Sequence, residues 1–380
     1  MLNDMKQIAL RLMQQSGFSR ALSASRWRHD RLLILGHHGV SQDDEHLWNP
    51  ELYMSPQQFR SQLELIEAQG FKVLTLGEAL ARLYSGRLPD RALCLTFDDG
   101  TVDFYRTVHP ILQGFGYPVT LYLTTYYCCV NKPVFPPALA YILWKGRGQA
   151  ASYPRALNHH AQPMDLRTEE GRQAAHARIW AFAEGQAFSA SEKHALLAEV
   201  ASAVGYNFGT MLARRVHHLM NPDEVAKVSR EGVDVELHAH RHRRPLDRDL
   251  FRREISDNRK AIEQLTGRTP VHFCYPSGRT HPSFIQWLSD EGVNVGDDLQ
   301  IGHRRPPEPA AAPAATHLRL ADHATRIVVL ALGRRCAAAA AAARASASRA
   351  GARRVRPRTV LIALRVTAVQ QVFLGNQGCG

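Results

Sequence analysis

The chain has no long apolar run, no CxxC cysteine pair and no lysine after Lys260. Without about 20 consecutive apolar residues, the sequence contains no candidate transmembrane helix. Residues 1–20 carry apolar side chains at helical spacing, but they lack the continuous apolar core of a signal peptide. The six cysteines have no zinc-knuckle spacing. We therefore expect a cytoplasmic location, with peripheral contact with the inner membrane as the alternative.

Positive charge is concentrated at one end of the chain. The protein has 380 residues, a hydrophobic share of 45% and a net charge of +12, a composition typical of a globular protein. Residues 304–380 hold 13 Arg and two acids, a charge of +11. The first 303 residues hold 34 basic and 33 acidic groups, so this part has no strong field to attract a polyanion.

The tail, residues 304–380, has an unusual composition. It contains seven consecutive alanines, Ala337–Ala343, and an Arg-rich run at 353–358. One interpretation is a flexible basic extension that binds an acidic partner. The other is translation of GC-rich DNA in a shifted reading frame, which yields Ala, Arg and Pro without Lys.

Alternating strand and helix patterns follow an N-terminal helical segment at 1–30. Strands are expected at 31–36, 71–76, 92–97, 119–124, 233–238 and 271–275, and helices at 55–70, 77–84, 221 onward, 253–265 and 284–291. This alternation predicts a parallel α/β sheet or barrel across residues 31–303. Residues from about 134 to 220 interrupt it and are expected to form a mostly helical insertion.

Two clusters have residue types suited to catalysis. Asp98 and Asp99 follow an apolar strand, where paired carboxylates are unfavourable unless a cation or a function compensates. The alternative is a helix N-cap.

On a strand, His238, His240 and His242 would alternate onto one face, as metal ligands could. The alternative for them is a solvated basic loop.

The order of three motifs resembles the polysaccharide deacetylase family, the NodB-homology or carbohydrate esterase family 4 group. The motifs are Thr-Phe-Asp-Asp-Gly at 96–100, Leu-His-Ala-His-Arg-His-Arg at 237–243 and Phe-Cys-Tyr-Pro-Ser-Gly at 273–278. The bacterial subgroup with a Tyr-Leu-Thr-Thr-Tyr-Tyr segment, here at 122–127, is especially similar. The resemblance covers residues 31–293 and implies a distorted (β/α) barrel with fewer than eight regular strands.

The resemblance also implies roles for the matched residues. Asp98 would be the catalytic base that accepts a proton from the attacking water. Asp99, His238 and His242 would bind a divalent metal, with zinc expected. His240 would lie between these ligands without binding the metal.

The third motif would line the substrate groove. Its members are Tyr275, Pro276, Ser277 and Gly278. The backbone N–H of Ser277 would stabilise the oxyanion that forms during amide hydrolysis. The expected reaction removes acetyl groups from N-acetylated sugars of a poly- or oligosaccharide.

The sequence departs from the family at several positions. Many relatives have an Arg at the position of Cys274, and that Arg orients the catalytic Asp. His38 matches a recurrent family position and is a predicted site member, with a capping or core His as the alternative. No closing Leu-x-His segment is found after Val293, which favours the shifted-frame interpretation of the tail and leaves the general acid unassigned.

The leading prediction is therefore a metal-dependent carbohydrate deacetylase with an N-acetylated glycan as its partner. One rival is a catalytically impaired glycan-binding relative of the same fold. The lower rival is a nucleic-acid-binding protein that uses the Arg-rich tail, although this tail has few aromatics for stacking bases. No specific nucleic acid is expected, and the sequence does not determine the oligomeric state.

Overall fold

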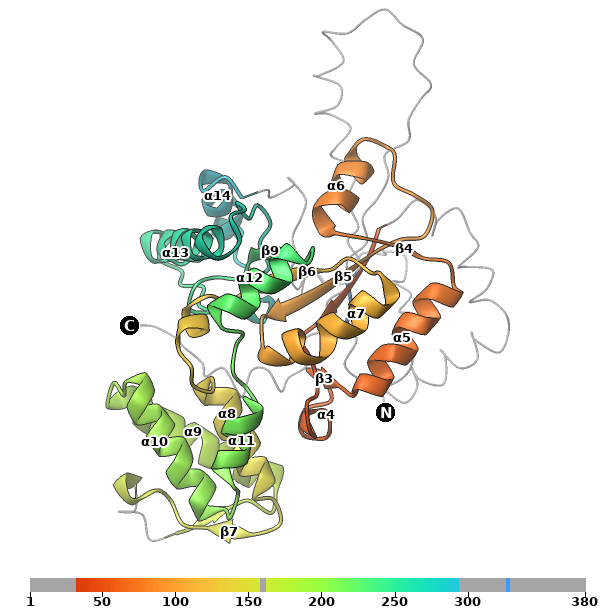
Figure 1. Ribbon diagram of the computed structural model, residues 1–380. Helices are drawn as coiled ribbons and strands as arrows, with labels where there is room; N and C mark the ends of the chain where they lie inside the picture. Colours follow the sequence, from red (N-terminus) through yellow and green to blue (C-terminus); the bar gives the residue numbers. More distant parts are fainter. Residues whose placement is uncertain (1–31, 158–161, 294–325, 329–380) are drawn as a thin grey trace, which may run out of the picture.

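The computed structural model describes residues 32–157, 162–293 and 326–328 (Figure 1). The N-terminal segment predicted at 1–30 and nearly all of the tail lie outside these residues. In the part of the chain that is described, no helix has the length and apolar character needed to cross a membrane.

The fold is built on one mostly parallel sheet. Its strands are β1 (Leu33–His37), β4 (Lys72–Leu74), β5 (Ala92–Asp99), β6 (Thr120–Leu123), β9 (Asp234–Leu237) and β10 (Arg326–Val328). The order along the sheet is β10-β1-β5-β6-β9, and β4 pairs with the first half of β5. Among the strands described in this sheet, β10, from the tail, is the one that runs antiparallel to its neighbour. The predicted α/β class is confirmed.

Some helices surround this sheet, whereas α8 to α11 form a separate group below it in the view of Figure 1. They are α4 (Glu45–Trp48), α5 (Pro56–Ala68), α6 (Leu76–Tyr84), α7 (His109–Phe115), α8 (Phe135–Lys145), α9 (Glu169–Gly185), α10 (Ala190–Ala203), α11 (Phe208–Arg214), α12 (Pro222–Arg230), α13 (Arg248–Thr266) and α14 (Pro282–Asp290). Short two-residue strands also pair, β2 (Gly39–Val40) with β3 (Tyr53–Met54) and β7 (Ala150–Ala151) with β8 (Met164–Asp165).

The central strand β5 is apolar on both faces because both faces are covered. Leu93, Leu95 and Phe97 belong to one hydrophobic core, whereas Ala92 and Cys94 belong to another that includes residues of α6. Such two-sided burial explains why parallel strands appear in sequence as continuous apolar runs.

Local sequence signals explain the start of α5. The Ser55 hydroxyl accepts a hydrogen bond from Gln58 N–H at 3.2 Å, and the Gln58 side chain accepts one from Ser55 N–H at 2.8 Å. This reciprocal capping satisfies two backbone donors that the helix leaves unpaired. Ser55 is therefore the N-cap of the helix predicted at 55–70.

The strand predicted at 271–275 is wrong. Only an isolated bridge forms there, between Leu237 and Phe273. Pro270 and Pro276 flank this segment and have no N–H to donate to a ladder. The segment therefore continues the sheet for one residue and then turns into the 3₁₀ helix η4 (Pro276–Gly278).

Most of the segment 134–220 packs around a core of its own, whose buried residues lie between 135 and 216. Buried side chains of α8, α9, α10 and α11 form one cluster that is separate from the cores of the sheet. The two ends of this segment meet, because Val134 N–H donates to His217 C=O at 2.8 Å. The chain thus leaves the sheet region and returns to it at one place.

Candidate metal centre

The ends of three neighbouring strands bring the predicted site together. Asp99 is in register with Leu123 at the end of β6, and Leu123 is in register with Leu237 at the end of β9. Because the three strands are parallel, their carboxyl ends meet at one edge of the sheet. Sites in α/β folds commonly gather at such an edge.

Asp99, His238 and His242 converge at this edge. The Asp99 Oδ1 atom lies 3.2 Å from the Nε2 atoms of both His238 and His242. One ligand atom from each residue lies within 4.8 Å of the others. His238 is buried, while the side chains of His242 and Asp99 are 27% and 32% exposed. Two imidazoles and one carboxylate form a donor set that zinc accepts, with positions left open for other ligands.

The predicted alternation of three histidines along a strand is wrong. Strand β9 ends at Leu237, and Ala239 adopts a left-handed backbone conformation with φ of 62°. The chain therefore turns immediately after His238, and His242 returns to Asp99 from a loop. His240 instead contacts Thr125, with its Nδ1 atom 2.8 Å from the hydroxyl.

One nitrogen of His238 is oriented by the backbone. The Nδ1–H group donates to Cys274 C=O at 2.9 Å, which directs Nε2 towards Asp99. An imidazole whose second nitrogen is hydrogen-bonded in this way is typical of metal ligands. The donor atoms present therefore fit a divalent cation.

Electrostatics couples the carboxylate to the imidazoles. Burial alone would raise the pKa of Asp99, but the charge of His242 and the hydrogen bonds from His238 and His242 hold that pKa well below its usual value. Burial would lower the pKa of His238, but the Asp99 hydrogen bond and the charges of Asp98 and Asp99 raise it overall. The lowered pKa keeps Asp99 ionised, and the raised pKa of His238 shows that the two carboxylates favour positive charge at its imidazole.

Asp98 has two neighbours that could orient it. The Cys274 thiol lies 3.6 Å from Asp98 Oδ2, and His38 Nε2 lies 3.8 Å from the same oxygen. Burial and the nearby Asp98 charge raise the pKa of Cys274 well above its usual value, so the thiol stays neutral and can donate. A thiol and an imidazole thus both lie beside the Asp98 carboxylate.

The remaining predicted residues follow Cys274 directly. Tyr275 is buried, and its ring contacts Phe273 and Phe284. Pro276, Ser277 and Gly278 form η4, in which Ser277 has a φ of 58°. The Gly278 N–H donates to Tyr275 C=O at 2.9 Å. The predicted contact of these residues with a substrate stays a prediction.

Sequence analysis missed Asp103. This residue is 4% exposed, and its carboxylate accepts a hydrogen bond from Val40 N–H at 2.9 Å. Asp103 thereby holds the short strand β2 that follows His38. A Cβ atom on Gly39 would lie 2.4 Å from the Tyr53 ring, so β2 and β3 pack tightly there. The available signal was a third Asp in Asp-Asp-Gly-Thr-Val-Asp at 98–103.

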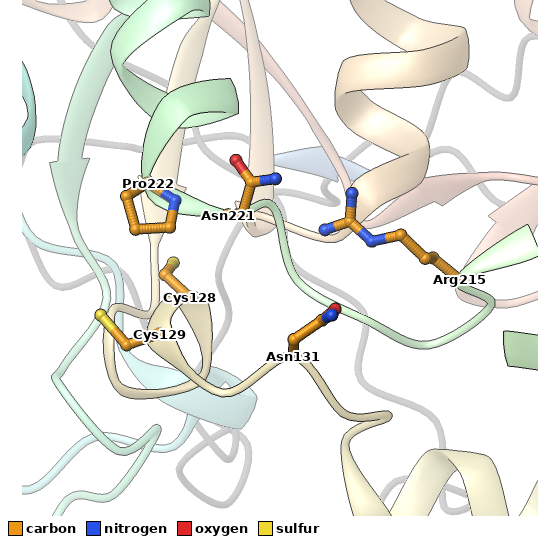
Figure 2. A pocket seen from close by; sticks show the side chains of 6 residues that line it. All are labelled: Cys128, Cys129, Asn131, Arg215, Asn221 and Pro222. Carbon is orange, nitrogen blue, oxygen red and sulfur yellow. The ribbon is translucent and has the colours of Figure 1, made fainter. Parts of the chain in front are cut away.

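A separate cavity lies beside the start of α12 (Figure 2). Its volume is about 550 Å³, and it is lined by Cys128, Cys129, Asn131, Arg215, Asn221 and Pro222. None of the predicted site residues lines it. The candidate site is therefore identified by its converging ligands and not by this cavity.

Part of the chain matches a known protein family. Residues 192–296 match the family model described as polysaccharide deacetylase, a segment that contains His238 and His242. Among solved structures, the chain is similar to the deacetylase PplD of Streptococcus pyogenes in complex with acetate, at 16% identity and a TM-score of 0.44, covering 70% of this chain and 82% of that one. It is also similar to IcaB from Ammonifex degensii, at 17% identity and a TM-score of 0.41, covering 70% and 82% of the two chains.

Curated proteins match over shorter segments. A poly-beta-1,6-N-acetyl-D-glucosamine N-deacetylase of Escherichia coli strain K12 is 30% identical over 98 residues, 26% of this chain and 14% of that protein. A Staphylococcus epidermidis protein of the same name is 32% identical over 72 residues, 19% of this chain and 25% of that protein. The aligned segments thus span a quarter or less of these two proteins. Residues 192–296 thus match the polysaccharide deacetylase model, and shorter segments of the chain are similar to curated N-deacetylases.

Proposed function

We propose that the chain is a metal-dependent hydrolase that removes acetyl groups from N-acetylated sugars of a poly- or oligosaccharide. The observation that carries this proposal is the convergence of Asp99, His238 and His242 beside the second carboxylate, Asp98. The names of the curated relatives, which are N-deacetylases of an N-acetylglucosamine polymer, support the substrate class.

Asp99, His238 and His242 would hold the metal, and zinc is the proposed ion because of this donor set. A bound zinc ion supplies Lewis acidity, which polarises a carbonyl and lowers the pKa of water. His238 would bind as a neutral imidazole, with Nε2 unprotonated and Nδ1–H donating to Cys274 C=O. Asp99 contributes the negative charge of the donor set.

Asp98 is the proposed base. It is adjacent to Asp99, and its Oδ2 atom is near the Cys274 thiol and His38. A carboxylate held in this way can accept the proton of the attacking water while its neighbours keep it in place. His38 and the Cys274 thiol are positioning groups in this proposal, and His240 supports the loop through Thr125.

Backbone N–H groups after Cys274 are the proposed oxyanion donors. Gly278 N–H already donates a hydrogen bond to Tyr275 C=O. Ser277 N–H is therefore the proposed donor to the oxyanion. The loop is held because Arg244 Nε donates to Pro276 C=O at 3.1 Å. A fixed donor stabilises the negative charge that develops on the acetyl oxygen during amide hydrolysis.

The test is an acetate-release assay with metal content measured on the same sample. The substrates are N-acetylated saccharides, including β-1,6-linked N-acetylglucosamine oligomers. We expect zinc in the wild-type chain and acetate from at least one substrate. Asp98→Asn should keep its metal and lose about 10²–10⁴-fold in rate, because the base is removed. Asp99→Ala should lose the metal as well.

Glu67→Gln, an exposed change on α5, is the matched control and should behave as wild type. Acetate release by Asp98→Asn at the wild-type rate would show that Asp98 is not the base. Bound metal without acetate from any saccharide would instead favour the glycan-binding relative.

A further inference from the structure

Helix α13 carries two polar side chains on its buried face. Asn258 is fully buried and Glu254 is 5% exposed, one turn apart on a face that also buries Phe251, Ile255 and Ile262. Polar groups in such surroundings are unfavourable unless they are hydrogen-bonded. Their partners therefore show what these two side chains do in the molecule.

Asn258 joins the ends of two strands. Its Oδ1 atom accepts a hydrogen bond from the backbone N–H of His238 at 2.9 Å. Its Nδ2 group donates to Leu123 C=O at 3.0 Å and to the Thr125 hydroxyl at 2.9 Å. One buried amide thus fixes the point at which β9 ends and the point at which the chain leaves β6.

Glu254 holds the next part of the loop. Its backbone C=O accepts a hydrogen bond from His240 N–H at 3.1 Å, and its carboxylate accepts one from Arg241 N–H at 2.7 Å. The Arg241 guanidinium also forms ion pairs with the carboxylates of Glu254 and Asp257, with N···O distances of 3.1 Å and 3.2 Å. Three backbone donors between 238 and 241 are therefore bound by one helix.

We infer that α13 positions the metal loop, defined as residues 238–242, and that Asn258 and Glu254 are positioning residues for His238 and His242. The inference rests on the proposed function of that site. The loop contains two residues with positive φ, Ala239 at 62° and His242 at 58°. Such backbone conformations persist where the surrounding structure enforces them, and the bonds from α13 enforce them here.

Metal affinity tests this inference directly. Asn258→Leu replaces the amide with an apolar side chain of similar size and removes all three hydrogen bonds. We expect zinc affinity, measured by competition with a coloured chelator, to fall about 10–100-fold, as when partners of metal ligands are removed. With Co²⁺ in place of zinc, the visible absorption band should also change, because the ligands no longer meet in the same arrangement.

Ile262→Ala is the matched control, because Ile262 is buried on the same helix one turn from Asn258. It should lower stability in metal-free buffer while keeping wild-type zinc affinity and the wild-type Co²⁺ spectrum. Equal loss of affinity in Ile262→Ala and Asn258→Leu would overturn the inference, since helix packing alone would then explain it. Wild-type affinity in Asn258→Leu would overturn it too.

A second pair of variants decides the question if Asn258→Leu does not fold. Glu254→Ala removes the acceptor for Arg241 N–H, whereas Glu254→Gln keeps an oxygen at that position. We expect weaker zinc binding in Glu254→Ala and restored binding in Glu254→Gln. Equal affinities in the two variants would contradict the inference. A wild-type chain that binds no zinc would instead refute the proposed function, so the two failures are distinguishable.

Discussion

At the scale of single residues, buried polar groups shape the surroundings of the candidate site. Asp103 illustrates this, because its side chain is buried beside strand β2, which follows His38, and accepts a hydrogen bond from Val40 N–H. Burial, as the largest cause, raises the pKa of Asp103 to about 7. The folded chain therefore holds a proton on this side chain under conditions in which the unfolded chain has lost it.

The sign of the resulting pH dependence can be stated. Between pH 3.8 and about 7 the folded state binds more protons at Asp103 than the unfolded state does, so this group makes the protein less stable as pH rises. Asp103→Asn removes the titration. We expect the free energy of unfolding of the variant to improve relative to wild type as pH rises across this range, as measured by urea denaturation.

The exposed Asp290 serves as a control, because its pKa is shifted in the opposite direction to that of Asp103. The Gln286 amide and Arg248 lower its pKa, so Asp290→Asn should show no relative gain as pH rises. A constant difference in stability between wild type and Asp103→Asn at every pH would contradict the prediction.

At the scale of elements, the residue that caps the start of α13 differs from the two residues of α13 that bind the metal loop. The Asp247 carboxylate caps the helix by accepting Leu250 N–H at 2.9 Å. We expect Asp247→Ala to lower the free energy of unfolding by about 1 kcal/mol, because one backbone donor loses its partner. Urea denaturation measures this loss, and zinc affinity should stay at the wild-type value.

Asp249→Ala is the matched control for this prediction, since Asp249 lies in the same first turn and makes no cap. Its effect on stability should be smaller than that of Asp247→Ala. A fall in zinc affinity in Asp247→Ala as large as in Asn258→Leu would show that the whole helix, and not the two buried side chains, controls the loop.

At the scale of the whole molecule, the proposed metal would link distant parts of the chain. Asp99 ends β5, while His238 and His242 follow β9, 139 or more residues later. A ligand that binds only the folded state stabilises it by about 2.7 kcal/mol at a concentration 100 times its dissociation constant. Chelation should therefore lower the melting temperature of the wild-type chain, and added zinc should restore it.

Asp99→Ala should melt at one temperature with or without zinc. This comparison separates binding at the candidate site from binding elsewhere, which would shift the melting temperature of both proteins. A wild-type melting temperature that does not respond to chelator or to added zinc would count against the metal centre.

Much of the sheet could be predicted from sequence because its strands are apolar on both faces. The triad could be predicted because its residues belong to motifs that occur in a recognisable order along the chain, although the roles of these residues stay untested. The path of the metal loop could not be predicted, because nothing in the sequence marks Ala239 for a left-handed conformation. Asn258 was missed for a similar reason: a polar residue on a helix suggests a solvent-facing position until its packing is known.

The hydrogen bond between Val134 and His217 has a consequence for how quickly the sheet can assemble. Strands β6 and β9 are adjacent, yet more than 100 residues separate them along the chain. Bringing distant residues together slows folding, because the entropy of loop closure must be lost first. Once residues 134–217 have packed on their own core, their ends already meet. The loop that must then close between β6 and β9 is effectively short, so its closure costs less entropy. We therefore expect this segment to fold before β6 pairs with β9.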